Sequence, residues 1–286
     1  MNVLLIGSDS PVGEALQGVF AKWGRHQAQA VSTSASRWRI ERKAKKSTRK
    51  NKPDAVLDLS FVNRLAGGEP ITAEDVDRVH WVAKACEHSG ICFFFVSSDQ
   101  VYAGLTGRAL RETDPADASL EPGLRCIEAE NRVSQAAPSA IVLRIGPVFD
   151  GSGQNTLTRL LRDFASLSVV TLDDRDVYCP LSAADLARVL GAMLDQLSAG
   201  AQPRGVFHYS SADRTTEFGF GETVLAAASQ FSAVADVVLQ AEETQAGEHT
   251  HTRVLDCSRL RDTFAIKQVP WRASINHEVR RFYRPD

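Results

Sequence analysis

The N-terminus of the chain joins a short apolar run to a turn that contains glycine and then to a helix. Residues 3–6 are apolar and end at Gly7, which is typical of a buried strand. Gly13 follows, and Pro11 between the two glycines suits the first turn of a helix over residues 11–23. A strand, a glycine turn and a helix in this order form the first unit of a parallel α/β sheet.

Strand-like and helix-like segments alternate through the first half of the chain. The predicted strands are residues 27–31, 55–59, 91–96 and 140–143, and the predicted helices are residues 72–89 and 124–136. Such alternation predicts a Rossmann-type, doubly wound parallel sheet with right-handed crossovers. We therefore expect a Rossmann-like domain over residues 1–145. Residues 146–286 should form a smaller C-terminal α/β lobe, with some segments returning to the main domain.

The composition disfavours several classes of protein. The chain has 286 residues, 43% of them hydrophobic, and a net charge of −2, so no global field selects a nucleic acid or a membrane. No apolar stretch approaches the ~20 residues of a membrane span, and the N-terminus has no signal-peptide pattern. The five cysteines are scattered and show no C-x-x-C spacing. We expect reduced thiols in a cytoplasmic protein and no metal site.

Positive charge is concentrated in residues 37–52. This segment contains nine Lys or Arg and a single acid, Glu41, which leaves 24 basic and 34 acidic residues elsewhere, a net charge of −10. A charge run of this kind is usually a solvated loop, which is the structure expected here. The basic segment is also a candidate for binding RNA or an acidic protein surface. Nucleic acid is disfavoured, because Trp38 is the only aromatic residue in the segment that could stack on a base.

Motifs in a fixed order along nearly the whole chain resemble the dTDP-4-dehydrorhamnose reductase family of the extended short-chain dehydrogenase superfamily. The matching stretches are residues 53–58, 96–104, 112–114, 143–144, 185–187 and 253–260, with Glu130, Pro180, His208, Phe264, Trp271 and Arg272. The resemblance implies a Rossmann-type fold, a nicotinamide cofactor and a nucleotide-activated 4-keto sugar as substrate.

The catalytic pair of that family is missing from this chain. The resemblance implies a tyrosine that protonates the alkoxide and a lysine four residues later that lowers the tyrosine pKa and holds the ribose. Aligning Gly123 and Glu130 with the family pattern puts Pro122 at the tyrosine position and Cys126 at the lysine position. No tyrosine anywhere in the chain is followed by lysine four residues later. The chain therefore resembles a catalytically degenerate member of the family.

Ser98 and Tyr102 are the remaining candidates for catalysis. Ser98 stands at the family's hydroxyl position, and its alternative role is that of a serine in an ordinary strand-end turn. Tyr102 stands where the family has phenylalanine. It is therefore either a packing residue or a substitute proton donor.

The predicted cofactor site combines the N-terminal turn with two other segments. The turn residues that would approach the pyrophosphate are Gly7, Ser10, Pro11, Val12 and Gly13. Ser10 stands where a middle glycine is usual, and Ser60 precedes Phe61, which replaces a small residue near the cofactor. The second strand ends without an acid for a ribose 2′-OH, whereas Arg37 and Arg39 follow it and suit a 2′-phosphate. We expect NADP(H) in preference to NAD.

Two functions are consistent with these residues. The first is a binding or regulatory protein that holds NADP(H), a nucleotide sugar or a protein partner without ordinary hydride transfer. The regulatory subunit of methionine adenosyltransferase is a precedent that the resemblance suggests. The second is an NADPH-dependent reductase of a nucleotide-activated 4-keto sugar with a non-standard proton donor. The missing pair favours the first.

Overall fold

A central parallel sheet organises the computed structural model, which describes all residues except 51, 106, 232–233, 235, 244–249 and 285–286. The strands of this sheet are β1 (Asn2–Ile6), β2 (Gln27–Val31), β3 (Ala55–Asp58), β4 (Cys92–Ser98), β5 (Ile141–Ile145) and β10 (Gly205–Tyr209). Within the described residues their order is β10-β5-β4-β3-β1-β2, and every neighbouring pair is parallel. The predicted Rossmann-type α/β fold is confirmed.

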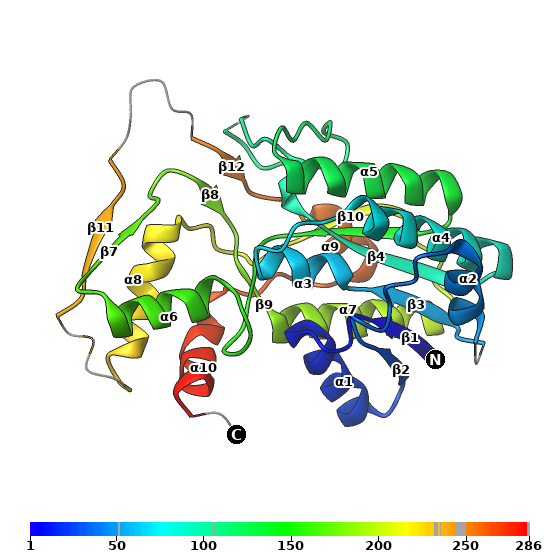
Figure 1. The fold of residues 1–286 in the computed structure, drawn as a ribbon, viewed down its shortest axis with the longest axis horizontal. Helices are drawn as coiled ribbons and strands as arrows, with labels where there is room; N and C mark the ends of the chain where they lie inside the picture. Colours follow the sequence, from blue (N-terminus) through cyan, green and yellow to red (C-terminus); the bar gives the residue numbers. More distant parts are fainter. Residues whose placement is uncertain (51, 106, 232–233, 235, 244–249, 285–286) are drawn as a thin grey trace.

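Helices cover both faces of the sheet (Figure 1). The first face carries α1 (Pro11–Trp23), α7 (Ala183–Ser198) and α9 (Ser258–Phe264), and the second carries α2 (Glu41–Arg49), α4 (Ala73–Ser89) and α5 (Glu121–Ala136). The short helix α3 (Ser60–Ala66) follows β3 at its carboxyl end. Each face buries its own apolar core, as a parallel sheet requires. None of the described helices is both long enough and apolar enough to cross a membrane.

A smaller lobe follows β5 and lies on the left in Figure 1. Its core is formed by α6 (Thr156–Ser166), α8 (Glu217–Ala228) and α10 (Arg272–Tyr283), with β7 (Val169–Leu172) paired to β11 (Val238–Ala241). Shorter pairs join β6 (Val148–Phe149) to β9 (Leu181–Ser182) and β8 (Val177–Tyr178) to β12 (Thr252–Arg253). The chain also returns to the main sheet after residue 145, where it supplies β10, α7 and α9.

The expectation of a solvated loop over residues 37–52 is wrong. Most of the segment is helix α2, which packs on α4. Trp38, three residues before the helix, is buried in the core. Ala44 and Thr48 are one helical turn apart and both are buried. The charge count hid this pattern, because two small residues at helical spacing and one tryptophan suffice to bury one side of a helix.

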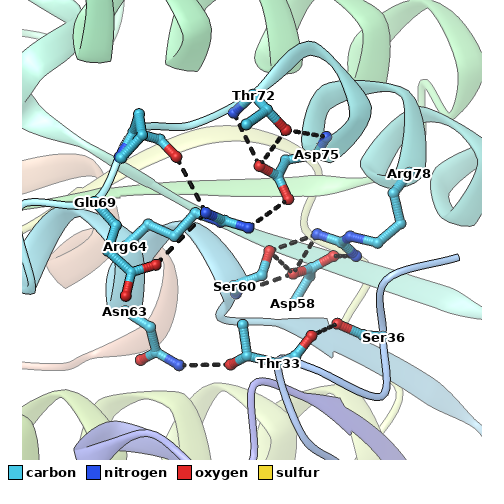
Figure 2. A network of polar contacts seen from close by, with 11 residues as sticks. Thr33, Ser36, Asp58, Ser60, Asn63, Arg64, Glu69, Thr72, Asp75 and Arg78 are labelled. Carbon is cyan, nitrogen blue, oxygen red and sulfur yellow. Dashed lines mark hydrogen bonds and ion pairs between the residues drawn. The ribbon is translucent and has the colours of Figure 1, made fainter. Parts of the chain in front are cut away.

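A buried ion pair ties β3 to α4 (Figure 2). Arg78 Nη1 donates to Asp58 Oδ2 at 2.6 Å, and both side chains are almost inaccessible to solvent. Ser60 Oγ donates to Asp58 Oδ1 at 2.6 Å and accepts from Arg78 Nη2 at 2.5 Å. The three side chains thus form hydrogen bonds with one another at the carboxyl end of β3, and Ser60, one of the predicted cofactor residues, is held among them.

Replacing Arg78 with leucine would leave the Asp58 carboxylate buried without its counterion. We expect Arg78→Leu to lower the free energy of unfolding by about 3–5 kcal/mol in urea denaturation, because an unpaired buried charge is strongly destabilising. The double variant Asp58→Asn/Arg78→Leu should recover most of this loss. As a control, Arg261→Leu removes an exposed ion pair to Asp262 and should cost less than about 1 kcal/mol. A double variant as unstable as Arg78→Leu would contradict this account.

Candidate functional site

Two adjoining cavities open at the carboxyl ends of the central strands. The first, of about 240 Å³, lies beside the turn between β1 and α1. The second, of about 310 Å³, lies at the ends of β4 and β5 and is also lined by residues of the smaller lobe. Val62, Ala66 and Val148 line both cavities. Ligands of doubly wound folds bind at this edge of the sheet, so the two cavities together form the candidate functional site.

The turn beside the first cavity has the backbone of a dinucleotide-binding turn. Gly7 has a φ of +81°, and a Cβ on Gly13 would lie 2.5 Å from the Gly7 carbonyl oxygen, so both positions require glycine. Ser10, at the middle position, caps α1: its Oγ accepts from the Gly13 amide at 2.8 Å and donates to the Gly7 carbonyl at 2.6 Å. Ser10, Pro11 and Val12 line the cavity.

Acidic side chains give the first cavity a negative wall. Asp9, Glu69 and Asp150 line it, and no Lys or Arg does among the residues that the structure describes. Arg281 binds Asp150 at 2.7 Å, whereas Asp9 Oδ1 accepts from the amide and the hydroxyl of Thr33 at 2.7 and 2.9 Å. The backbone of the turn therefore fits a dinucleotide, while the Asp9 carboxylate opposes the charge of a diphosphate.

Arg37 and Arg39, the predicted contacts of a 2′-phosphate, line a neighbouring cavity of about 220 Å³ together with Arg64. Arg64 Nη1 lies 3.6 Å from Glu69 Oε2, and Glu69 lines the first cavity, so this ion pair joins the two cavities (Figure 2). The structure thus brings the two arginines beside the dinucleotide turn without placing them in its cavity.

Ser60 and Phe61 lie in the core rather than on a cavity wall. Both belong to α3, a helix that the sequence analysis did not predict. The Phe61 ring is fully buried and packs edge-on against Phe95 at 5.0 Å, and Ser60 is held by Asp58. The helical turn directs Ser60 and Phe61 toward the core, while Val62 lies against the cavities.

Ser98 ends β4 and lines the second cavity. Its Oγ donates to Asp99 Oδ1 and accepts from the Gln100 amide, both at 3.1 Å. The hydroxyl is therefore engaged within its own turn, which is the bond pattern of a strand-end cap.

The two positions of the missing catalytic pair bring no proton donor to this cavity. Pro122 lies exposed in the first turn of α5, and Cys126 is fully buried on the same helix. Burial raises the pKa of the Cys126 thiol to about 12, so the sulfur carries no charge near neutral pH. Neither residue lines the second cavity.

Tyr102 belongs to a buried polar network that joins α5, β5 and β10. Its hydroxyl accepts from Arg144 Nη1 at 2.5 Å and lies 3.0 Å from His208 Nε2. Arg144 in turn donates to Glu130 at 2.6 Å. Burial raises the Tyr102 pKa to about 12. The side chain does not line the second cavity, and this placement argues against a role as substitute proton donor.

Tyr178 is a cavity residue that the sequence analysis missed. It lies on β8 in the smaller lobe and lines the second cavity together with Ser98 and Arg253. Burial raises its pKa, so the phenol stays protonated and can donate a hydrogen bond to a ligand. No local pattern points to Tyr178, because only tertiary packing brings it to the end of β4.

Comparison with known proteins decides the family. The model of the RmlD substrate binding domain matches residues 1–284. The chain belongs to this family. The dTDP-4-dehydrorhamnose reductase of Sinorhizobium fredii is 26% identical over 243 residues, which are 82% of each chain. The crystal structure of a dTDP-4-dehydrorhamnose reductase from Clostridium acetobutylicum is similar with a TM-score of 0.80, at 18% identity and 98% coverage of both chains. That from Bacillus anthracis, in complex with NADP, has a TM-score of 0.78, at 14% identity and 96% coverage of both.

Asp99 is a buried carboxyl group behind Ser98 in this member of the RmlD family. Its side chain is 1% exposed, and Oδ2 has no hydrogen-bond partner within the described part of the chain. Burial raises its pKa to about 6, against the opposing influence of Arg253. The folded state therefore binds a proton more tightly here than the unfolded chain does, so the stability of the fold decreases as the pH rises from the ordinary carboxyl pKa of about 4 to about 6.

Asp99→Asn should stabilise the protein at alkaline pH. Near pH 8 the wild-type carboxylate is charged, and its replacement should raise the free energy of unfolding by on the order of 2 kcal/mol. At about pH 3 the wild-type group is protonated in both the folded and the unfolded chain, and the two proteins should unfold at nearly the same temperature. Thermal melts at both pH values measure this difference. Asp262→Asn, at an exposed site, is the control and should change neither melt. An equal gain at both pH values would refute the ionisation of Asp99 as the cause.

Proposed function

We propose that this RmlD-family chain binds a nicotinamide dinucleotide or a nucleotide sugar in the two adjoining cavities without ordinary hydride transfer. The observation that carries this proposal is the identity of residues 122 and 126. Pro122 has no acidic proton and Cys126 is buried and uncharged, so the two positions of the catalytic pair supply neither the proton donor nor the cation that would activate it. The cavities themselves, the glycine turn and the family membership support the retention of a nucleotide ligand.

Specific residues would hold such a ligand. The backbone of Gly7 and Gly13 would allow a dinucleotide to approach α1, with its diphosphate at the helix N-terminus. Tyr178 can donate a hydrogen bond to a ligand oxygen in the second cavity. Arg253 also lines it, 3.9 Å from Asp176, and carries a positive charge among the carboxylates of Asp173, Asp176 and Glu217. A nicotinamide cofactor would supply a hydride when bound. The residues that would manage the accompanying proton are the ones that this chain lacks.

A second function, an NADPH-dependent reductase of a nucleotide-activated 4-keto sugar, draws support from one contact. Ser98 lines the second cavity and hydrogen-bonds to Asp99, whose pKa is about 6. In that case Ser98 and Asp99, rather than Tyr102, would form the non-standard donor.

The two functions differ in turnover. We expect no measurable NADPH oxidation with a dTDP-4-keto sugar, because loss of general acid catalysis alone costs about 10²–10⁴ in rate. A family member that has the Tyr-x-x-x-Lys pair, assayed in parallel, verifies the substrate. Ser98→Ala and Tyr102→Phe should leave ligand binding nearly unchanged in calorimetry, because both hydroxyls are already engaged within the protein. Turnover at ordinary enzyme rates that Ser98→Ala abolishes would establish the reductase instead.

Cofactor preference tests the role of the two arginines. We expect NADPH to bind at least about tenfold more tightly than NADH, since a charged hydrogen bond to the 2′-phosphate contributes on the order of 1.5–3 kcal/mol. Arg37→Gln/Arg39→Gln should remove this difference and leave the NADH dissociation constant unchanged. Arg204→Gln, an exposed cation elsewhere, is the matched control. Equal affinities in the wild type would contradict the assignment of these arginines.

A further inference from the structure

Helix α2 and its flanking residues present a cationic surface that the two cavities do not use. The exposed cations of this α2 surface are Arg42, Lys43, Lys46, Arg49, Lys50 and Lys52. The helix packs on α4 and lies on the right in Figure 1, at the opposite side of the molecule from the smaller lobe. A macromolecule that bound the α2 surface would therefore leave the second cavity, which the smaller lobe helps to line, open.

The protein does not neutralise this charge. The one acid of the segment, Glu41, is already bound by Lys45 at 2.7 Å and by Lys84 at 3.3 Å. None of these six exposed cations forms an ion pair with an acidic residue in the part of the chain that the structure describes. Outside residues 37–52 the sequence carries a net charge of −10, so this segment differs in sign from the average of the rest of the chain.

The fold holds these cations together against their mutual repulsion. Arg42 and Lys46, and Lys46 and Lys50, are like charges four residues apart, a spacing that destabilises a helix. Burial of Ala44 and Thr48 against α4 nevertheless fixes the helix. A solvated loop would spread the same charges apart, whereas the helix presents them on one side. This arrangement suits a partner with a dense array of negative charges.

Two side chains discriminate between the kinds of polyanion. Trp38 is 5% exposed, so the surface offers no aromatic ring for base stacking. Ile40, the residue directly before α2, is 56% exposed among the cations. An apolar side chain gains little at the phosphate backbone of a nucleic acid, which is polar and solvated. The Ile40 side chain would gain apolar contact at a lipid bilayer, where a layer of headgroup phosphates covers the hydrocarbon chains.

We propose that the α2 surface adsorbs on anionic phospholipid bilayers, with its Lys and Arg side chains at the lipid phosphates and Ile40 at the boundary between headgroups and acyl chains. This is a peripheral contact that needs no membrane-spanning segment. It does not depend on the proposed nucleotide binding, because the cations on the outer side of α2 line neither of the two adjoining cavities.

Vesicle flotation of the full chain tests the proposal. The protein should float with vesicles of phosphatidylcholine containing roughly one quarter phosphatidylglycerol and stay in solution with pure phosphatidylcholine, and high salt should release it. Arg42→Gln/Lys46→Gln/Arg49→Gln should lower the partition coefficient roughly 100-fold, since each of the three cations contributes about fivefold to binding at an anionic surface. Ile40→Ser should lower it about fivefold, as expected for one partly inserted aliphatic side chain.

A matched triple variant separates the α2 surface from total charge. Lys22→Gln/Arg214→Gln/Arg280→Gln removes three exposed cations from other parts of the fold, none of which forms an ion pair within the described residues, and should leave flotation unchanged. Thermal melts establish that both triple variants are folded. Three results would each overturn the proposal: no flotation of the wild type with anionic vesicles, an equal loss in the control variant, or tighter binding to a nucleic acid duplex than to the vesicles.

Discussion

Burial of both faces of a parallel sheet is the constraint on which the rest of the structure depends. A parallel sheet exposes no face to water in a stable fold, so helices must cover it on either side. This requirement explains why the chain returns after residue 145 to supply α7, α9 and the edge strand β10. It also explains why a segment as charged as residues 41–49 becomes a helix, since α2 extends the layer that α4 and α5 form.

The same constraint separates the fold from its chemistry. Arg144, Glu130, Tyr102 and His208 remain joined in a buried network because they connect α5, β5 and β10. The two positions of the catalytic pair lie on α5, where Pro122 is exposed in the first turn and Cys126 is buried one turn later, so a proline and a buried thiol are both compatible with packing. A scaffold of this kind can therefore persist when the residues that transfer a proton are lost.

Charge is distributed on this scaffold in an unusual way. The dinucleotide turn carries the Asp9 carboxylate, whereas Arg37 and Arg39 line the neighbouring cavity and precede α2. We therefore expect anionic groups to bind weakly at the turn and strongly at the outer face of α2. Nucleotide recognition would depend more on backbone fit and on the 2′-phosphate than on the diphosphate, while the α2 surface acts independently of the cavities.

The sequence by itself determined the alternation of strands and helices in the first half of the chain, the glycine turn and the absence of a Tyr-x-x-x-Lys pair, because each depends on residues close together in the chain. Tertiary structure alone decided where the side chains point. In the tertiary structure Phe61 packs against Phe95 in the core and Tyr102 hydrogen-bonds to Arg144. Tyr178, from the smaller lobe, lines the cavity at the end of β4. These placements arise from contacts between residues distant in sequence, and no local pattern records them. Helix α2 depends on both levels: the sequence shows Ala44 and Thr48 at helical spacing, but only the packing of α2 on α4 buries them.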